Sequence, residues 1–161
     1  MKKFTVILVA MAVLSLNAMA DTGCGWGVWF DVPKSVSNTD VDGIGLGLPL
    51  IANRSTEGLS LALIGNNVQK LEGLQFAFFG FNYAKTMEGA QVGFVNLNRG
   101  QHGDCAVQIG CFNQSGKNGV QLGFINNGKD NATFQLGFLN INKNGLLPVM
   151  IFINFGTGLF D

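Results

Sequence analysis

The pattern of apolar and polar positions repeats along most of this chain. Residues 118–127 read NGVQLGFINN and residues 133–142 read TFQLGFLNIN, so Gln, Gly and Asn keep fixed places among the apolar residues. A repeated apolar pattern alone requires only a core. Polar residues that recur in register require a further reason.

Alignment on the repeated glutamine reveals about eight units. Five units match well, and the spacings between their glutamines are 16, 17, 13 and 14 residues. Three weaker copies place Gly45, Ser60 or Val149 at the glutamine position. The glutamines of the well-matched units are Gln75, Gln91, Gln108, Gln121 and Gln135.

Within one unit the alternation is strict and then breaks. Val120, Leu122 and Phe124 point to one side of an extended strand, but Ile125 follows Phe124 directly. The same doublet of large apolar residues recurs as Phe78-Phe79, Phe94-Val95, Cys111-Phe112 and Phe138-Leu139. A corner between two short strands would let both members of each doublet face one core. We therefore expect Phe124 to be buried, between Cys111 and Phe138 of the adjacent units.

These features predict an all-β fold, a β-solenoid of about eight short-strand coils with a period of 13–17 residues and capped ends. Parallel coils place equivalent residues roughly 4.8 Å apart, so that side-chain amides can hydrogen-bond from coil to coil. The repeated polar residues would then be partners of their own copies. The predicted divisions are a signal peptide at 1–20, an N-terminal cap segment at 21–40 and a repeat domain at 41–161.

A small outer-membrane β-barrel is the alternative fold. About eight alternating segments and the abundance of Gly and Phe are typical of such barrels. The apolar runs are shorter than the roughly 9–11 residues of a spanning strand, and girdles of Tyr and Trp are missing. The pattern therefore favours the solenoid.

The first residues are typical of an export signal. Lys2 and Lys3 precede the apolar stretch FTVILVAMAVLSL, and Ala-Met-Ala at 18–20 supplies small residues for cleavage after Ala20. A transmembrane anchor is the other interpretation, but the apolar run is shorter than the roughly 18 residues that spanning requires. We expect an exported chain that stays in the periplasm, associates with the outer membrane or reaches the cell surface.

Composition excludes some partners. Charged residues make up 12% of the chain and their charges sum to zero, which argues against a nucleic-acid partner. The sequence predicts membrane contact only if the barrel alternative holds. Gly (23 residues) and Phe (14 residues) are both abundant, and this combination favours short strands over helices.

The units GVQLGFINN, GAQVGFVNLN and TFQLGFLNIN, followed by LLPVMIFINFG, resemble a family of bacterial exported surface-repeat proteins of the Leptospira and Vibrio type. The hallmark of that family is a tandem G-[VL]-Q-[IVL]-G-[LF]-[IV]-N motif, and the resemblance covers residues 43–156. It implies export, with the cell surface as one destination. It supplies no catalytic residue.

Few residues offer chemistry. His102 is the only histidine, and its neighbours Asp104 and Cys105 lie in a polar linker, so neither a zinc set nor a nucleophile–base pair is indicated. Cys24, Cys105 and Cys111 leave one cysteine odd in an oxidising compartment, and the pairings Cys105–Cys111, Cys24 with either, or no disulfide stay open.

The carboxylates lie mostly in linkers. Glu57, Glu72 and Glu88 each precede a repeat glycine, which indicates a stacked, solvated corner with calcium binding as the less favoured reading. The glycine-rich runs match no nucleotide-binding motif. We expect no catalytic residue, no metal and no cofactor.

The remaining candidate is the glutamine row itself. If Gln75, Gln91, Gln108, Gln121 and Gln135 point outward, they form a flat face that is either a self-bonded scaffold or a binding face for a protein or a glycan. The expected function is a non-catalytic exported structural or interaction module. The competing expectation is a membrane barrel with an anchoring or transport role.

Overall fold

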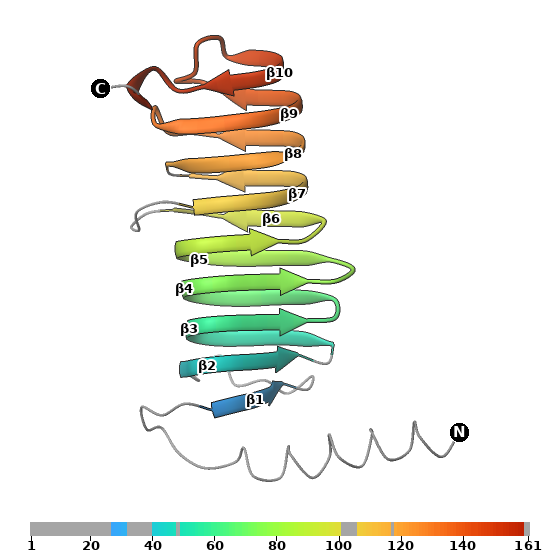
Figure 1. The fold of residues 1–161 in the computed structure, drawn as a ribbon. Coiled ribbons are helices and arrows are strands. Elements are labelled where there is room, and N and C mark those ends of the chain that lie inside the picture. The colour runs from blue at the N-terminus through green and yellow to red at the C-terminus, as the bar shows by residue number, and fades with distance from the viewer. Residues whose placement is uncertain (1–26, 32–39, 48, 101–105, 117, 160–161) are drawn as a thin grey trace.

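The structure, a computed structural model, describes residues 27–31, 40–47, 49–100, 106–116 and 118–159. Strands wind into a β-solenoid of about six turns, which confirms the predicted solenoid and rules out the barrel alternative, although the turns are fewer than the eight coils expected (Figure 1). The strands are β1 Gly27–Asp31, β2 Asp40–Gly47, β3 Leu50–Ala62, β4 Gly65–Ala77, β5 Phe81–Val92, β6 Val95–Asn98, β7 Ala106–Ser115, β8 Gly119–Gly128, β9 Thr133–Asn142 and β10 Val149–Phe155, and a 3-10 turn, η1, spans Thr157–Leu159.

The coils stack in parallel and in the register that the repeat predicts. Ser60 pairs with Gln75, and the glutamines of the later coils pair successively from Gln75 to Gln135. The first strand, β1, also pairs in parallel, with Gly27 opposite Gly43. The parallel strand pairing of the repeat therefore extends into the segment that was expected to be a cap.

Each coil bends at the predicted corner, but its side chains point opposite to the prediction. Phe124 is 59% exposed and Gln121 is 1% exposed. Phe124 does stack on Phe138 of the next coil, with ring centroids 5.0 Å apart and planes 6° apart, yet this stack lies on the outside. Cys111 is exposed as well. The expectation that Phe124 is buried between Cys111 and Phe138 is therefore wrong.

Buried glutamines form a continuous ladder along the axis. The side-chain amide of Gln121 donates to Oε1 of Gln108 at 2.8 Å, and that of Gln135 donates to Oε1 of Gln121 at 2.8 Å. The same bond joins Gln91 to Gln75 and Gln108 to Gln91. The predicted coil-to-coil amide bonding is confirmed, and it satisfies groups that would otherwise be costly to bury.

A second ladder of asparagines runs beside the first. Asn126 Nδ2 donates to Oδ1 of Asn140 at 2.8 Å, and Asn113 Nδ2 donates to Oδ1 of Asn126 at 2.9 Å. The asparagine amides donate towards the C-terminal coils, whereas the glutamine amides donate towards the N-terminal coils. The two rows of amide dipoles therefore oppose each other.

The ladders also tie segments before the corner to segments after it, both within a coil and between neighbouring coils. Asn126 Nδ2 donates to the carbonyl of Leu136 at 3.0 Å, and Gln135 Nε2 donates to the carbonyl of Ile141 at 3.1 Å. These bonds cross the interior between the segment before the corner and the segment after it. The polar interior of this protein is therefore a core that hydrogen bonds hold together.

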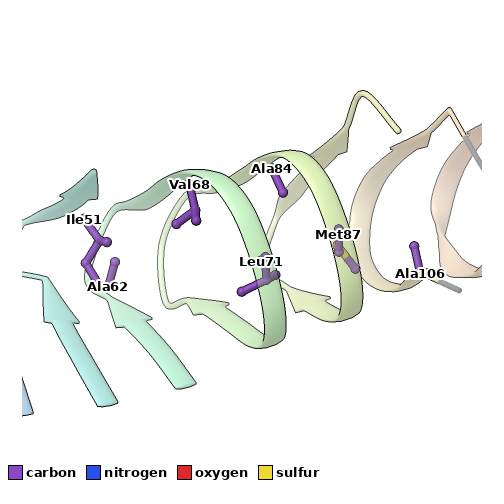
Figure 2. Packing of buried hydrophobic residues seen from close by; sticks show 7 residues of the cluster. All are labelled: Ile51, Ala62, Val68, Leu71, Ala84, Met87 and Ala106. Carbon is purple, nitrogen blue, oxygen red and sulfur yellow. The ribbon is translucent and has the colours of Figure 1, made fainter. Parts of the chain in front are cut away.

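A small apolar cluster occupies another part of the interior, in the longer N-terminal coils. The cluster consists of Ile51, Ala62, Val68, Leu71, Ala84, Met87 and Ala106 (Figure 2). Leu71 and Met87 come from the chain segment whose outer side carries Lys70, Glu72 and Glu88. In these coils the charged exterior therefore lies over apolar side chains, and the apolar exterior lies over amides.

The last unit does not stack as a coil. β10 pairs antiparallel with β9, so that Asn154 rather than Val149 lies opposite Gln135. Asn154 is fully buried and donates to the carbonyl of Leu147 at 3.0 Å. The prediction that Val149 takes the glutamine position is therefore wrong, because the chain reverses direction before this unit.

Candidate interaction surface

The outer side of the corner carries the most exposed aromatic row. This corner row contains Phe78 (55% exposed), Phe94 (53%), Phe124 (59%) and Phe138 (54%), with Leu63 and Cys111 at equivalent positions. The corner between β4 and β5 is longer than the later corners, because Phe81 rather than Phe79 pairs with Val95. Phe79 is therefore an additional corner residue, 73% exposed, and not the counterpart of Val95 as the doublets suggested.

The segment before the corner presents an entirely apolar outer surface, called here the first face. In β8 its outward residues are Val120 and Leu122, and in β9 they are Phe134 and Leu136. None of its outward positions carries a polar side chain from β3 to β9. The first face consists of Leu59, Leu61, Leu74, Phe76, Ala90, Val92, Val107, Ile109, Val120, Leu122, Phe134 and Leu136.

The segment after the corner, called here the second face, changes gradually in character. Its outward row next to the corner is apolar from β5 to β9, with Phe81, Val95, Phe112, Ile125 and Leu139. Its next outward row is mixed: Asn67, Tyr83, Leu97, Gln114, Asn127 and Ile141. Polarity therefore rises with distance from the corner.

Tyr83, the one tyrosine of the chain, lies at the polar limit of the second face. The Arg99 guanidinium lies over its ring, 5.9 Å from the centroid. An amphipathic ring beside a cation is a common arrangement at the boundary between an apolar phase and water.

Charged side chains lie in the part of the chain that joins the second face of one coil to the first face of the next. This charged edge includes Arg54, Glu57, Lys70, Glu72, Lys85, Glu88, Arg99, Lys129 and Lys143. Arg54 forms an ion pair with Asp40, and Lys70 forms one with Glu72. Lys70 donates a hydrogen bond to the Glu72 carboxylate, and this bond and the negative charge of Glu72 raise the pKa of Lys70, so this lysine stays protonated and is unsuited to act as a nucleophile.

The predicted column of carboxylates does form. Glu57 lies opposite Glu72 in the strand register, and Glu72 lies opposite Glu88, so the three residues occupy equivalent positions in adjacent coils. Within the described part of the chain, however, no group of three or more potential metal ligands comes together. The column is a solvated part of the charged edge, and Lys70 neutralises part of its charge.

The predicted binding row lies inside the protein. Gln75, Gln91, Gln108 and Gln135 are 0% exposed and Gln121 is 1% exposed. The expectation that these residues form an outward face for a protein or a glycan is therefore wrong, because their side chains fill the interior. The apolar residues that were assigned to the core form the accessible surface instead.

One sequence signal could have revealed the correct orientation. Gly123 lies on the inward side, and a Cβ there would be 2.1 Å from the Gly110 carbonyl oxygen and 2.4 Å from Asn113 Nδ2. A glycine two residues after four of the five glutamines, with Ala77 after Gln75, therefore marks the crowded side of the strand. Crowding of this kind belongs to an interior and not to an open face.

Several predictions concern residues outside the described ranges. These are the signal peptide at 1–20, most of the cap segment at 21–40, His102, Asp104, Cys24 and Cys105. Cys111 is a free, exposed thiol. The corner position that it occupies carries phenylalanine in both following coils, so it continues the apolar corner row.

None of the described residues belongs to a helix long and apolar enough to cross a membrane. No known family model, no curated protein and no solved structure gives a match to this chain. The resemblance to exported surface-repeat proteins therefore stays a prediction from the motif, and the surface described above carries the functional argument.

Proposed function

We propose that this protein is a non-catalytic, exported structural or interaction module that works through its apolar exterior. The corner row carries the proposal, because four phenylalanines in successive or nearby coils are each more than half exposed. Soluble monomers rarely expose a contiguous apolar surface of this extent without a partner for it. The first face adjoins the corner row and extends the same apolar surface.

The interior supports a structural rather than a catalytic role. Its buried amides bond mainly to one another and to backbone carbonyls. Within the described part of the chain, the buried amide atoms without a partner are Gln75 Nε2 and Gln135 Oε1, at the two ends of the glutamine ladder. Export rests on the predicted signal at residues 1–20. The periplasm, the outer membrane and the cell surface are all compatible destinations.

A hydrophobic-dye experiment tests the role of the exterior. A neutral solvatochromic dye should fluoresce strongly with the parent protein. The triple variant Phe94→Ser, Phe124→Ser, Phe138→Ser should lower this fluorescence at least twofold, because the corner row supplies the largest exposed rings. Its circular dichroism should keep the β-sheet spectrum, because these side chains lie outside the interior.

The matched control changes the same number of exposed residues on the charged edge. Lys85→Ser, Lys129→Ser, Lys143→Ser should leave the dye signal unchanged. A parent protein that gives no dye enhancement as a monomer would overturn the proposal. An equal loss of signal in both triple variants would count against the corner row as the working surface.

A further inference from the structure

We infer that the partner of the apolar exterior is the hydrocarbon of a lipid leaflet, in which the solenoid lies with its axis parallel to the membrane plane. This inference rests on the proposed function and names its partner. The first observation is the inverted distribution of polarity. Polar side chains fill the interior beneath the first face and the corner row, while Phe, Leu and Val cover these surfaces on the outside.

Such an inversion suits an apolar solvent. In water, burial of apolar side chains drives folding, whereas in lipid the outward side chains are already in an apolar medium. Internal hydrogen bonds then become the favourable contacts. Here the glutamine and asparagine ladders satisfy interior amides along the axis, at 2.8–2.9 Å between successive coils.

The shape of the surface favours lipid over a flat partner. The apolar residues cover the first face, the corner and the near row of the second face, so the surface is convex. A flat partner could cover one face and would leave the other in water. A fluid hydrocarbon phase covers both faces and the corner together.

The charges define the orientation. The charged edge runs along the axis from Arg54 in β3 to Lys143 after β9. An axis perpendicular to the membrane would bury part of this edge, whereas an axis in the plane keeps all of it in water. Tyr83 and Arg99, at the polar limit of the second face, would then lie at the lipid–water boundary.

The dimensions of the first face agree with this position. Val120 and Phe124 are four residues apart, which corresponds to roughly 13 Å at about 3.3 Å per residue. One leaflet contributes about 15 Å of hydrocarbon, half of the roughly 30 Å core. The corner row would thus reach towards the middle of the bilayer without crossing it.

The C-terminal cap continues the apolar surface, and its backbone is strained at one residue. β10 reverses direction, yet Ile153 stays exposed opposite Leu136, and Phe152 is 70% exposed near the corner. Phe152 has a φ of 71°, which is strained for a residue other than glycine. The strained position keeps a large aromatic ring outward at the corner, as in the preceding coils.

Vesicle flotation with the full exported chain tests the inference. Pure phosphatidylcholine vesicles should carry the protein to the top of a density gradient, equally at 50 mM and 1 M salt, because the first face and the corner row carry no charged side chain. Leu122→Asp with Phe124→Asp should reduce binding at least tenfold. Lys129→Asp, on the charged edge of the same coil, should bind like the parent.

A depth measurement keeps the test independent of the folding of the Asp variant. With Cys24, Cys105 and Cys111 replaced by Ser, a fluorophore is attached to Phe124→Cys or to Lys129→Cys. Quenchers near the ends of the lipid chains should quench the label at position 124 at least threefold more strongly than that at position 129. Equal quenching at both positions would overturn the inferred orientation.

Other outcomes separate this inference from the proposed function. A parent protein that binds the dye but does not float would overturn the lipid partner and leave the apolar working surface in place. A closed soluble oligomer that neither binds dye nor floats would assign the surface to contacts between copies of the chain. Flotation that requires anionic lipid and disappears in salt would also contradict the inference.

Discussion

Asn126→Ala is expected to destabilise the protein by about 3–9 kcal/mol. Asn126 donates to Asn140 at 2.8 Å and to the Leu136 carbonyl at 3.0 Å, and it accepts from Asn113 at 2.9 Å. Alanine leaves three buried polar groups without this partner, at a cost of about 1–3 kcal/mol each. The shift in the denaturant midpoint, measured in one mild detergent for all variants, gives the size of the effect.

The control in the same coil is Phe124→Ala. This side chain is 59% exposed, and its substitution removes mainly the stack on Phe138, an interaction of about 0.5–1.5 kcal/mol. The order of the two effects is the reverse of that in a protein with an apolar core, where a buried phenylalanine is worth about 3–5 kcal/mol. If Phe124→Ala proves the more damaging change, the orientation of the strands described here is incorrect.

Gly123→Ala is expected to cost about 3 kcal/mol or more, or to prevent folding. The added Cβ would lie 2.1 Å from the carbonyl oxygen of Gly110 and 2.4 Å from Asn113 Nδ2. The carbonyl belongs to the backbone of the adjacent coil, so relief requires the coils to move apart and disturbs the asparagine ladder. Thermal unfolding followed by circular dichroism measures the loss.

Gly45→Ala is the matched control. Gly45 is buried and lies in the glutamine register of an earlier coil, but a Cβ there has its nearest neighbour at 3.5 Å. Its substitution should be neutral or slightly stabilising, by up to about 1 kcal/mol, because alanine restricts the unfolded chain. Equal losses at both glycines would show that close packing of the coils is not the cause.

The spacing of the repeat was sufficient to predict the architecture. The alignment of Gln75, Gln91, Gln108, Gln121 and Gln135 predicted which residues pair between coils, and each of these pairings is present. The apolar doublets predicted the corner. These features depend only on residues that recur in order, and order is what a parallel stack repeats in space.

The inward and outward sides could not be predicted from the alternation itself. A period of two residues sorts side chains into two sets, and the choice of the buried set came from the assumption that Phe124 avoids water. That assumption holds for a protein in water whose surface contacts no apolar partner. It fails here because Gln121 and Asn126 bond to their counterparts in the neighbouring coils, and because the inward side at Gly123 is too crowded for any side chain.

The C-terminal end needed information that the repeat does not contain. The unit at 147–155 keeps the apolar character of a coil, but it has lost the glutamine and follows Pro148. The structure shows that it turns back on β9, where Asn154 meets Gln135. A reversal of chain direction leaves no periodic signal, so the sequence pattern alone predicts another parallel coil at this unit.

Hydrogen exchange of the side-chain amides tests the central claim most directly, since it requires no substitution. Nuclear magnetic resonance in D2O should show that the side-chain NH2 protons of Gln91, Gln108 and Gln121 persist for hours, because these groups are fully buried and bonded. Those of the exposed Asn67 and Gln69 should vanish within the dead time. Immediate exchange of the ladder glutamines, at the rate of Asn67 and Gln69, would contradict a polar interior.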